Sequence, residues 1–308
     1  MNPRPEQGPG WNGRDNASRP KERYGMKSMM RNLGAFFAVS LLLQTPANAV
    51  TIFSDSGPNV ASITDTVNAF RAALGDPNNG NNPGPLPTGR REINWDGGGP
   101  PVIDGTAPVT PFTVFQNTRG ATFTTPGTGL TQAAATGGLL SLDLINPQYA
   151  TLFAPFSPNR LFAPIGSNIT DGFFSIPGTA GSVPAGVSGF GVVFSDVDLA
   201  GTSIAFSTTA GAIGPLPVAT FAGNQTFSFL GIILGPTEGL ITNTRIITGT
   251  TALGPSESPT VDLVVMDDFL YGEPQKIPEP ETFVLLSSAL LIMVALGSRR
   301  SRRNGLAR

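Results

Sequence analysis

The sequence predicts a mainly β protein, with an antiparallel β-sandwich or jelly-roll body, one short N-terminal helix and a C-terminal transmembrane helix. The β prediction rests on short runs rich in Thr, Val, Ile and Phe that recur between Gly, Pro and Asn residues. One early segment has the spacing of an amphipathic helix, and one apolar stretch near the C-terminus is a candidate for membrane insertion.

The N-terminal end predicts export. Residues 26–49 have a basic start, an apolar stretch over 33–43 and an A-x-A cleavage motif formed by Ala47 and Ala49, as in a secretory signal peptide. Residues 1–25 are rich in Pro, Gly, Asn and charged residues and show no apolar periodicity. We interpret them as a mis-assigned start, with translation beginning at the methionine that opens the signal peptide. The alternative is a disordered extension of that peptide.

The first element expected in the body is a helix over 62–74. Ser62 or Thr64 is placed to cap its start, and Gly75 to end it. Its apolar residues follow i, i+4, i+7 spacing and are Ile63, Val67, Phe70 and Leu74. Residues 75–89 are dominated by Gly, Pro and Asn and predict an exposed loop.

After that loop, short apolar or alternating runs between turn-forming residues predict the strands of the sandwich. These runs are 112–115, 139–145, 169–176, 189–194, 203–206, 226–233, 240–247 and 261–270. The alanines and glycines at 131–138 predict another loop, and the sequence contains no internal repeat.

Residues 50–275 have a length that fits one extracytoplasmic β-sandwich domain. They contain six arginines, no lysine and sixteen aspartates plus glutamates, which gives a net charge of −10. This charge argues against a nucleic-acid partner, and it repels anionic membranes and acidic polysaccharides unless a cation bridges them. Because the chain has no cysteine, its stability has to come from a hydrophobic core.

The C-terminal segment 277–308 combines a Pro-Glu-Pro break, an apolar stretch over 283–297 and a basic cluster. The residues of the break and of the cluster are Pro278, Glu279, Pro280, Arg299, Arg300, Arg302 and Arg303. As a helix the apolar stretch spans about 20 Å, which is shorter than the roughly 30 Å hydrocarbon core. The arginines favour a cytoplasmic C-terminus, with the body on the other side of the membrane.

This arrangement resembles the PEP-CTERM sorting signal of exported bacterial proteins. The resemblance implies that 283–297 holds the body in the inner membrane until an exosortase-type enzyme processes the chain, which then reaches the cell surface or the medium. An ordinary tail anchor and a buried C-terminal helix are the alternatives. Segments 66–75, 89–97, 189–198 and 265–269 resemble a group of exported bacterial proteins that often carry this tail. That resemblance implies an extracytoplasmic β-domain and no particular activity.

The residue types present argue against catalysis. The chain has no histidine and no cysteine, which excludes Ser-His-Asp and Cys-His nucleophile systems and the usual zinc sites. Glycan hydrolysis needs two carboxylates beside the scissile bond, and none of the four glutamates in the body lies in a Glu-x-Asp-x-x-Glu string. We therefore expect no enzyme activity and no catalytic residues, and calcium is the one cofactor that we consider.

Two acidic pairs are candidate calcium ligands. Asp196 and Asp198 lie two residues apart and point to the same face if the strand continues, where they could share a hard cation. A solvated strand end is the favoured alternative. Asp267 and Asp268 are adjacent and expected on opposite faces, so that only one joins the buried side of a sheet. There calcium could tie strands together, or the residue could serve as a turn or cap.

A group of charged residues surrounds Trp95. Arg90, Arg91, Glu92 and Asp96 could form an ion-pair network with a structural role, which is the favoured interpretation. The alternative is a platform on which Trp95 stacks against a sugar ring.

Three functions follow from these observations. The first is a non-enzymatic protein of the envelope or extracellular matrix, associated with exopolysaccharide or biofilm. The alternative is a carbohydrate-binding jelly-roll module with structural calcium, and the third is a secreted glycan hydrolase built from spatially assembled aspartates. An aromatic-lined groove would favour binding, and paired carboxylates at the base of a cleft would favour hydrolysis. The expected partners are an exosortase-type enzyme, the inner membrane and polysaccharide.

Overall fold

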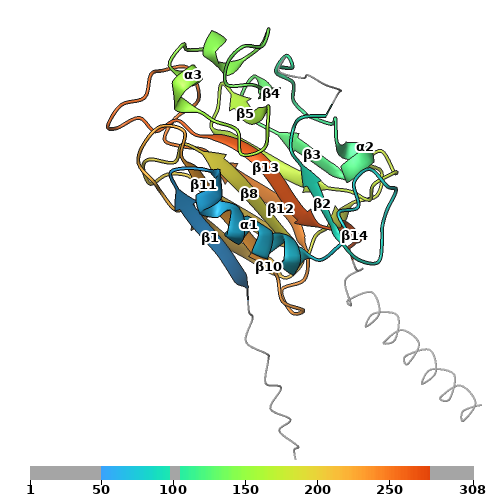
Figure 1. Cartoon of the computed structure of the whole chain (residues 1–308). Helices are drawn as coiled ribbons and strands as arrows, with labels where there is room; N and C mark the ends of the chain where they lie inside the picture. Colours follow the sequence, from blue (N-terminus) through green and yellow to red (C-terminus); the bar gives the residue numbers. More distant parts are fainter. Residues whose placement is uncertain (1–49, 98–104, 278–308) are drawn as a thin grey trace, which may run out of the picture. The chain divides into compact units, whose positions relative to one another are not determined.

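The computed structural model describes residues 50–97 and 105–277, which form a mainly β structure with two main antiparallel sheets (Figure 1). The first sheet has the strand order β1-β11-β8-β13-β5-β4, with β2 also paired to β13. Its strands are β1 Thr51–Gly57, β11 Phe227–Ile233, β8 Gly189–Ser195, β13 Val265–Gly272, β5 Leu161–Ile165, β4 Gly129–Ala133 and β2 Arg90–Ile93.

The second sheet has the strand order β10-β9-β12-β6-β3. Its strands are β10 Gly211–Pro217, β9 Ser203–Thr208, β12 Ile241–Ile247, β6 Ile169–Phe174 and β3 Ala121–Thr124. A two-stranded pair joins β14 Gln275–Lys276 to β7 Ala185–Gly186. The helical elements are α1 Val60–Leu74, α2 Gln116–Arg119, the 3₁₀ helix η1 Leu142–Leu144 and α3 Tyr149–Leu152.

An aromatic core fills the space between the two main sheets. The ring of Trp95 is stacked 3.7 Å from the ring of Phe162 in β5, and it meets Phe269 in β13 edge-on at 4.9 Å. Phe123 in β3 of the second sheet contacts Trp95 at 5.7 Å. Since one cluster draws its side chains from both sheets, the two sheets pack face to face in a sandwich-like arrangement.

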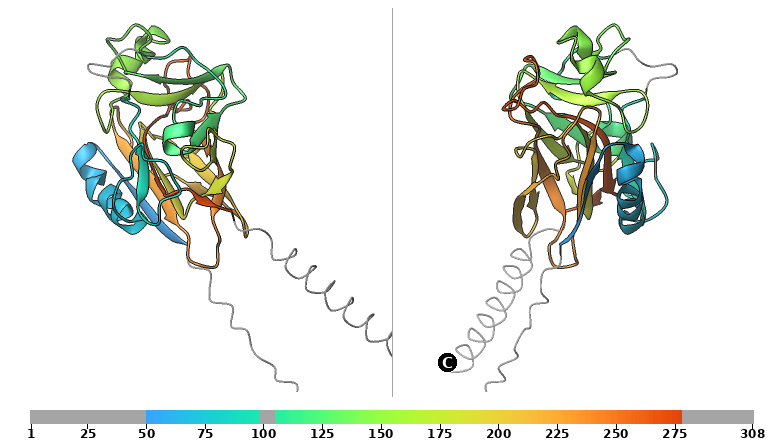
Figure 2. Two further views of the ribbon diagram at one scale, coloured as in Figure 1. Left: turned by 90° about the vertical axis from the view of Figure 1, so that its right-hand side faces the viewer. Right: turned by 60° about the vertical axis from the view of Figure 1, so that its left-hand side comes forward.

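Helix α1 covers the outer face of the first sheet (Figures 1 and 2). The apolar face predicted from the sequence is confirmed, because the buried residues of α1 are Ile63, Val67, Phe70 and Leu74. The helix begins at Val60, earlier than predicted, since Asn59 caps it by accepting a hydrogen bond from the Ser62 N–H. Gly75 ends the helix as predicted, with a φ of 99°.

Two paired glycines set how closely α1 approaches the sheet. Gly191 in β8 and Gly231 in β11 are cross-strand partners. A Cβ atom at either position would lie 2.8 Å from the ring of Phe70. The ring therefore fills a slot that only glycines leave open, and it meets Phe53 and Phe229 edge-on at 5.3 Å each.

Most of the strand predictions in the second half of the chain are confirmed. The runs 169–176, 189–194, 203–206, 226–233 and 240–247 correspond to β6, β8, β9, β11 and β12, and the run 261–270 becomes a strand only from Val265. The predictions at 112–115 and 139–145 are wrong, because Phe112 makes a single bridge and the other run contains η1 and turns. The loop predicted at 131–138 overlaps β4, which extends to Ala133.

Several sequence predictions lie outside the described residues. They are the interpretations of 1–25 and of the signal peptide 26–49 with Ala47 and Ala49, and the sorting signal with the helix 283–297 and the residues Pro278, Glu279, Pro280, Arg299, Arg300, Arg302 and Arg303. Within the described residues, no helix has the length and apolar character needed to cross a membrane.

Candidate metal site

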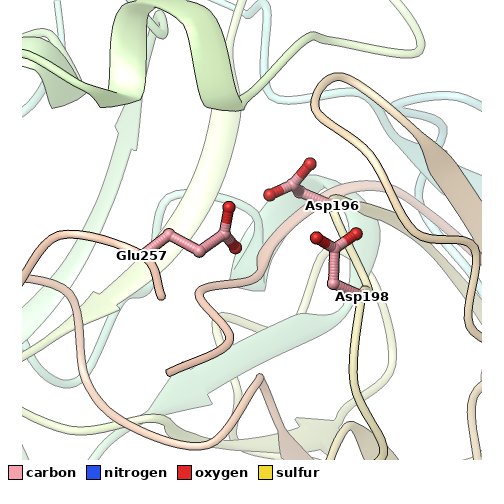
Figure 3. Close-up of side chains that lie close together, drawn as sticks. All are labelled: Asp196, Asp198 and Glu257. Carbon is pink, nitrogen blue, oxygen red and sulfur yellow. The ribbon is translucent and has the colours of Figure 1, made fainter. Parts of the chain in front are cut away.

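Three carboxylates from two separate connections meet beside β8 (Figure 3). Asp196 and Asp198 follow the last residue of β8, and Glu257 lies in the connection from β12 to β13. One oxygen from each side chain lies within 4.8 Å of the oxygens of the other two. The structure thus brings together two of the predicted calcium ligands and adds a third that the sequence analysis did not identify.

The strand does not continue through the aspartates, as the sequence argument had assumed. Asp196 has a φ of 71°, in the left-handed region, and its N–H donates to the carbonyl of Thr226 at 3.0 Å. A left-handed backbone is unfavourable for residues other than glycine, and such conformations are concentrated at functional sites. A turn, and not the period of a strand, therefore places Asp198 beside Asp196.

Hydrogen bonds tie the two connections together around the cluster. The Asp198 N–H donates to the carboxylate of Asp262 at 3.0 Å, and the Gly223 N–H donates to Oδ1 of Asp198 at 2.9 Å. The Glu257 N–H donates to Oε1 of Gln148 at 2.8 Å, which links the site to the residue before α3. The carboxylates are therefore positioned by backbone contacts from several segments.

Asp196 is the most unusual group of the site. Its side chain is 0% exposed, and neither carboxylate oxygen has a hydrogen-bond partner among the described residues. Burial, followed by the charges of Glu257 and Asp198, raises the pKa of Asp196 to about 9. Oε1 of Glu257 also lacks a partner, and burial raises the pKa of that carboxyl as well. Buried acids in such surroundings have to hold a proton or meet a cation.

Asp262 adds a fourth carboxyl next to the cluster. It is fully buried, and its Oδ2 has no partner among the described residues. Burial raises its pKa to about 6, although backbone N–H groups of Asp198 and Leu199 act in the opposite direction. None of the ion pairs between described residues involves any of these four acids. The site therefore concentrates negative charge without a basic side chain to balance it.

The donor set fits a hard divalent cation. Carboxylate oxygens are the ligands that calcium, magnesium and manganese prefer, and calcium accepts six to eight oxygens in flexible geometry. Asp196, Asp198 and Glu257 together offer up to six carboxylate oxygens, and water completes such sites in other proteins. In the absence of a cation, a proton shared between Asp196 and Glu257 is the arrangement consistent with their raised pKa values.

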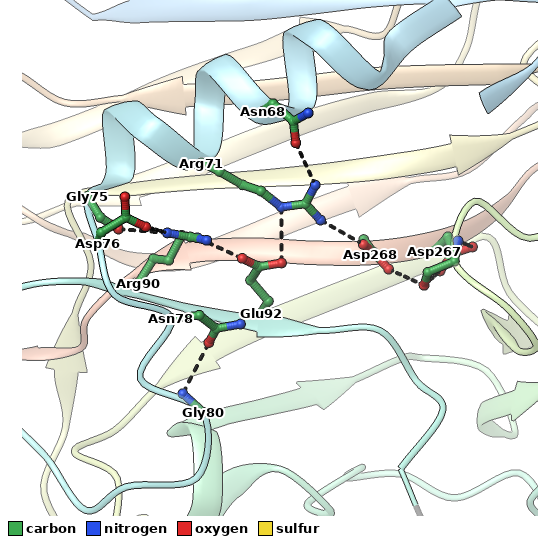
Figure 4. A network of polar contacts seen from close by, with 11 residues as sticks. Asn68, Arg71, Gly75, Asp76, Asn78, Gly80, Arg90, Glu92, Asp267 and Asp268 are labelled. Carbon is green, nitrogen blue, oxygen red and sulfur yellow. Dashed lines mark hydrogen bonds and ion pairs between the residues drawn. The ribbon is translucent and has the colours of Figure 1, made fainter. Parts of the chain in front are cut away.

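Asp267 and Asp268 lie in β13, apart from this cluster (Figure 4). The prediction that only one of them is buried is wrong, because both are buried. The register of β13 against β8 shifts between Met266 and Phe269, which pair with Phe194 and Val192. Three steps on β13 thus match two on β8, so a β-bulge changes the directions of the two aspartates.

Both bulge aspartates have partners within the chain. Oδ2 of Asp268 pairs with Nη2 of Arg71 at 3.1 Å, and the Ser157 hydroxyl donates to Oδ1 of Asp268 at 2.6 Å. Asp267 accepts hydrogen bonds from the N–H groups of Phe156 and Ser157. Burial raises the pKa of both carboxyls, and a side-chain hydrogen bond joins them. Their contacts indicate a structural role.

The arginines before Trp95 form ion pairs, as the favoured interpretation expected, but in two separate groups and without Asp96. Arg91 donates to both carboxylate oxygens of Glu273, at 2.6 and 2.7 Å, and both side chains are almost fully buried. Arg90 pairs with Glu92 at 2.6 Å. Glu92 also accepts from Arg71, so the network connects α1 to β2 and β13 (Figure 4).

Trp95 cannot serve as a sugar platform, because its side chain is 0% exposed and its ring lies in the central core. Its indole N–H donates to the Asp267 carbonyl at 2.8 Å. Asp96 accepts hydrogen bonds from the backbone N–H groups of Asn159 and Arg160. The aspartate therefore anchors the segment before β5, and the prediction of a stacking platform at this tryptophan is wrong.

Comparisons of the chain with protein-family models, with curated proteins and with solved structures found no match. The function is therefore argued from the geometry of the chain itself. Within that geometry, Glu257 and Asp262 are the residues that sequence reasoning missed. Glu257 lies in a Gly-Pro-Ser-Glu-Ser-Pro segment without periodicity, about sixty residues from Asp198. Only the fold brings these residues together.

Proposed function

We propose that this chain is a non-enzymatic, exported protein of the bacterial envelope or extracellular matrix, whose jelly-roll-like body binds a structural calcium ion. The observation that carries the calcium part is Asp196, a fully buried carboxyl without a hydrogen-bond partner among the described residues. It faces two further carboxylates within 4.8 Å. The export part is supported by the signal-peptide pattern at 26–49 and by the tail over 277–308, which resembles a sorting signal.

Calcium accounts for the electrostatics of the site better than a proton does. A bound divalent ion neutralises carboxylates that otherwise repel one another in a buried position. Calcium is common at millimolar concentration outside cells, and the body carries a net charge of −10. Magnesium keeps more of its water and demands octahedral geometry, so a cluster that combines Asp196 with flexible Glu257 favours calcium.

The proposed role of the ion is to hold connections together. Asp196 and Asp198 belong to the connection from β8 to β9, and Glu257 to the connection from β12 to β13. The long connection with Glu257 also contacts Gln148, the residue before α3, and Tyr149, the first residue of α3. An ion bound between these segments stabilises the folded state because the unfolded chain does not preserve the cluster.

Melting of the full chain in a mild detergent tests the calcium site. At 100 times its dissociation constant, calcium adds about 2.7 kcal/mol to the free energy of unfolding. For a domain of this size that is a rise in Tm of roughly 5–10 °C over EDTA. Asp196→Asn should abolish the rise, and Asp65→Asn, at an exposed position on α1, should preserve it. Equal shifts with magnesium, or a normal calcium response of Asp196→Asn, would contradict the site.

The export part has an independent test. We propose that residues 283–297 hold the chain in the inner membrane and that an exosortase-type enzyme cuts near Pro278–Pro280. Mass spectrometry of the cell-associated and released forms should then show an N-terminus near Val50 and, on the released form, a C-terminus near the Pro-Glu-Pro segment. A released form that retains 283–308 would rule out the processing step.

A further inference from the structure

A groove on the second sheet has a chemistry distinct from that of the metal site. Its volume is about 500 Å³, within the range of small-molecule sites. It is lined by parts of β3, β6 and β12, by the start of α2 and by the segment around Gly181 and Ala185. None of the described residues that line it carries a charge, which sets it apart in a body with sixteen carboxylates.

The sheet register builds a mixed aromatic and polar row across this groove. Phe173 in β6 pairs with Asn243 in β12 on one side and with Thr122 in β3 on the other. Cross-strand partners project from the same face of a sheet, so the three side chains lie in one line. Phe173 is 44% exposed, whereas the next residue along the strand, Phe174, is buried in the core. An aromatic ring thus faces the solvent between an amide and a hydroxyl.

Several polar groups in the groove can form hydrogen bonds with a ligand. Ser175 is 6% exposed, and its hydroxyl has no hydrogen-bond partner among the described residues. The amide of Asn243 donates to the Gly172 carbonyl at 3.0 Å, which fixes the side chain and leaves its oxygen as an acceptor. The Gln116 amide lies close to Gly181, where a Cβ atom would be 2.4 Å from its nitrogen. Glycine at 181 therefore leaves room for the Gln116 side chain.

We propose that this groove binds a neutral glycan. The apolar face of a sugar ring packs on an aromatic side chain, while its hydroxyls exchange hydrogen bonds with amides and hydroxyls. The lining offers both and no charge, which matches an uncharged polysaccharide. Acidic polysaccharide is disfavoured by the net charge of −10. The inference rests on the proposed function only in that the chain has to meet glycans outside the cytoplasm.

The exposed aromatic residue of this groove is Phe173, in place of the Trp95 named from the sequence. A second occupant deserves a direct test, because Ile277 also lines the groove and the Pro-Glu-Pro segment follows it in the chain. Proline-rich peptides dock in aromatic grooves. We favour the glycan because the segment carries the charges of Glu279 and Glu281, and none of the described residues that line the groove offers a positive charge to pair with them.

The test measures binding of the full chain, in a detergent without sugar groups, to an array of neutral oligosaccharides. Soluble laminarin and dextran serve as neutral polymers, and polygalacturonate as an acidic one. We expect binding to at least one neutral glycan and none to polygalacturonate. Phe173→Ala and Gln116→Ala should each weaken it at least tenfold with an unchanged melting curve. Phe221→Ala, at the other exposed phenylalanine of the described residues, should bind like the wild type.

Three outcomes would overturn the proposal. The first is that no neutral glycan binds, and the second is that Phe221→Ala weakens binding as much as Phe173→Ala. The third is that a synthetic peptide of residues 278–282 binds the groove and no glycan does, which would assign it to the chain's own C-terminal segment. Asp196→Asn should leave glycan binding unchanged when the protein is folded. The experiments can therefore refute the proposed calcium site and the proposed glycan groove independently of each other.

Discussion

Two groups of buried carboxylates in this protein are balanced in opposite ways. In β13 and at the residue that follows it, Asp268 and Glu273 are paired with Arg71 and Arg91, and Asp267 accepts backbone N–H groups. In the connections after β8 and β12, the buried oxygens of Asp196 have no partner among the described residues. Burial raises the pKa of Asp196, Asp267 and Asp268 alike. Both groups are therefore buried, and they differ in whether the chain itself supplies the charges and hydrogen bonds that offset the cost of burial.

The first group is therefore stabilised by contacts within the chain, whereas the second group depends on ions or protons from the surrounding solution. Asp268 and Glu273 carry their own counter-charges and Asp267 accepts backbone N–H groups, so the contribution of these acids does not depend on metal ions in the medium. The acids of the connections need a proton or a cation from outside. If the chain is exported and binds calcium as proposed, the second group makes the rigidity of the connections depend on the calcium concentration around the protein.

The largest effect is expected from Arg91→Met, which breaks the most deeply buried ion pair of the β13 group. The guanidinium is 0% exposed and its partner Glu273 is 2% exposed. Loss of the arginine leaves a buried carboxylate without its counter-charge, which costs roughly 3–5 kcal/mol. Urea unfolding with and without calcium should give the same loss, because the pair does not belong to the calcium site.

An exposed ion pair provides the matched control. Arg245 pairs with Asp171 on the second sheet, and the arginine side chain is 58% exposed. Arg245→Met should therefore cost no more than about 1 kcal/mol. The double variant Arg91→Met, Glu273→Gln should recover part of the stability lost in the single one. If the two arginine variants lose similar stability, burial does not distinguish the pairs as argued here.

How much of these two groups can be predicted from the sequence depends on how far apart in the chain the contacting residues lie. The helix that carries Arg71 follows from its own periodicity, since Ile63, Val67 and Phe70 have the spacing of one helical face. The bulge at Asp267 does not, because it requires the register of β13 against β8, which involves residues more than seventy positions apart. The sequence analysis assumed that successive side chains of this strand alternate between the two faces of the sheet. That alternation fails wherever a bulge inserts an extra residue.

Only the part of the metal site that is local in the sequence was predicted. Asp196 and Asp198 are close in the chain, so their proximity follows from local spacing. Glu257 comes from a connection without periodicity, and only tertiary structure brings it to Asp196. The alternative of a sugar platform at Trp95 is ruled out, because alternation in and after β2 places the ring in the core. The strands β2, β3, β4 and β5 were not predicted, because each is only four or five residues long. Strands β1 and β10 were also missed, although each has seven residues.

An intermediate effect is expected from pH. The pKa of Asp196 is about 9 and that of Asp262 about 6 in the folded chain, above 3.8 for the free carboxyl. A raised pKa means that the folded chain holds protons that the unfolded chain has released. Their contribution to stability in EDTA is fully present below about pH 4 and is lost as pH rises through the folded pKa, which for Asp196 is about 9.

Calcium should cancel this trend, because it binds the deprotonated carboxylates and the folded chain then holds no extra protons at the site. The gain in free energy of unfolding from calcium should grow between pH 5 and pH 8, by about 1.4 kcal/mol per pH unit for each proton displaced. Chemical unfolding at each pH, with calcium and with EDTA, measures it. Since Asp267 and Asp268 also titrate from raised pKa values, the comparison is made against Asp196→Asn. A calcium gain that does not change with pH would contradict proton displacement at this site.

The smallest change in the free energy of unfolding should come from Glu257→Gln, and whether it is a gain or a loss is what tests the comparison. Asp198 lies next to Glu257 and raises its pKa through like charge, after burial. Neutralising Glu257 removes that repulsion, so in EDTA the variant should be as stable as the wild type or more stable by a few tenths of a kcal/mol. With calcium it should be less stable than the wild type, because one ligand is weakened. Melting curves in the two media give both signs at once. A loss of stability in EDTA would show that Glu257 is held by partners within the chain, like the acids of β13, and the contrast between the two groups would disappear.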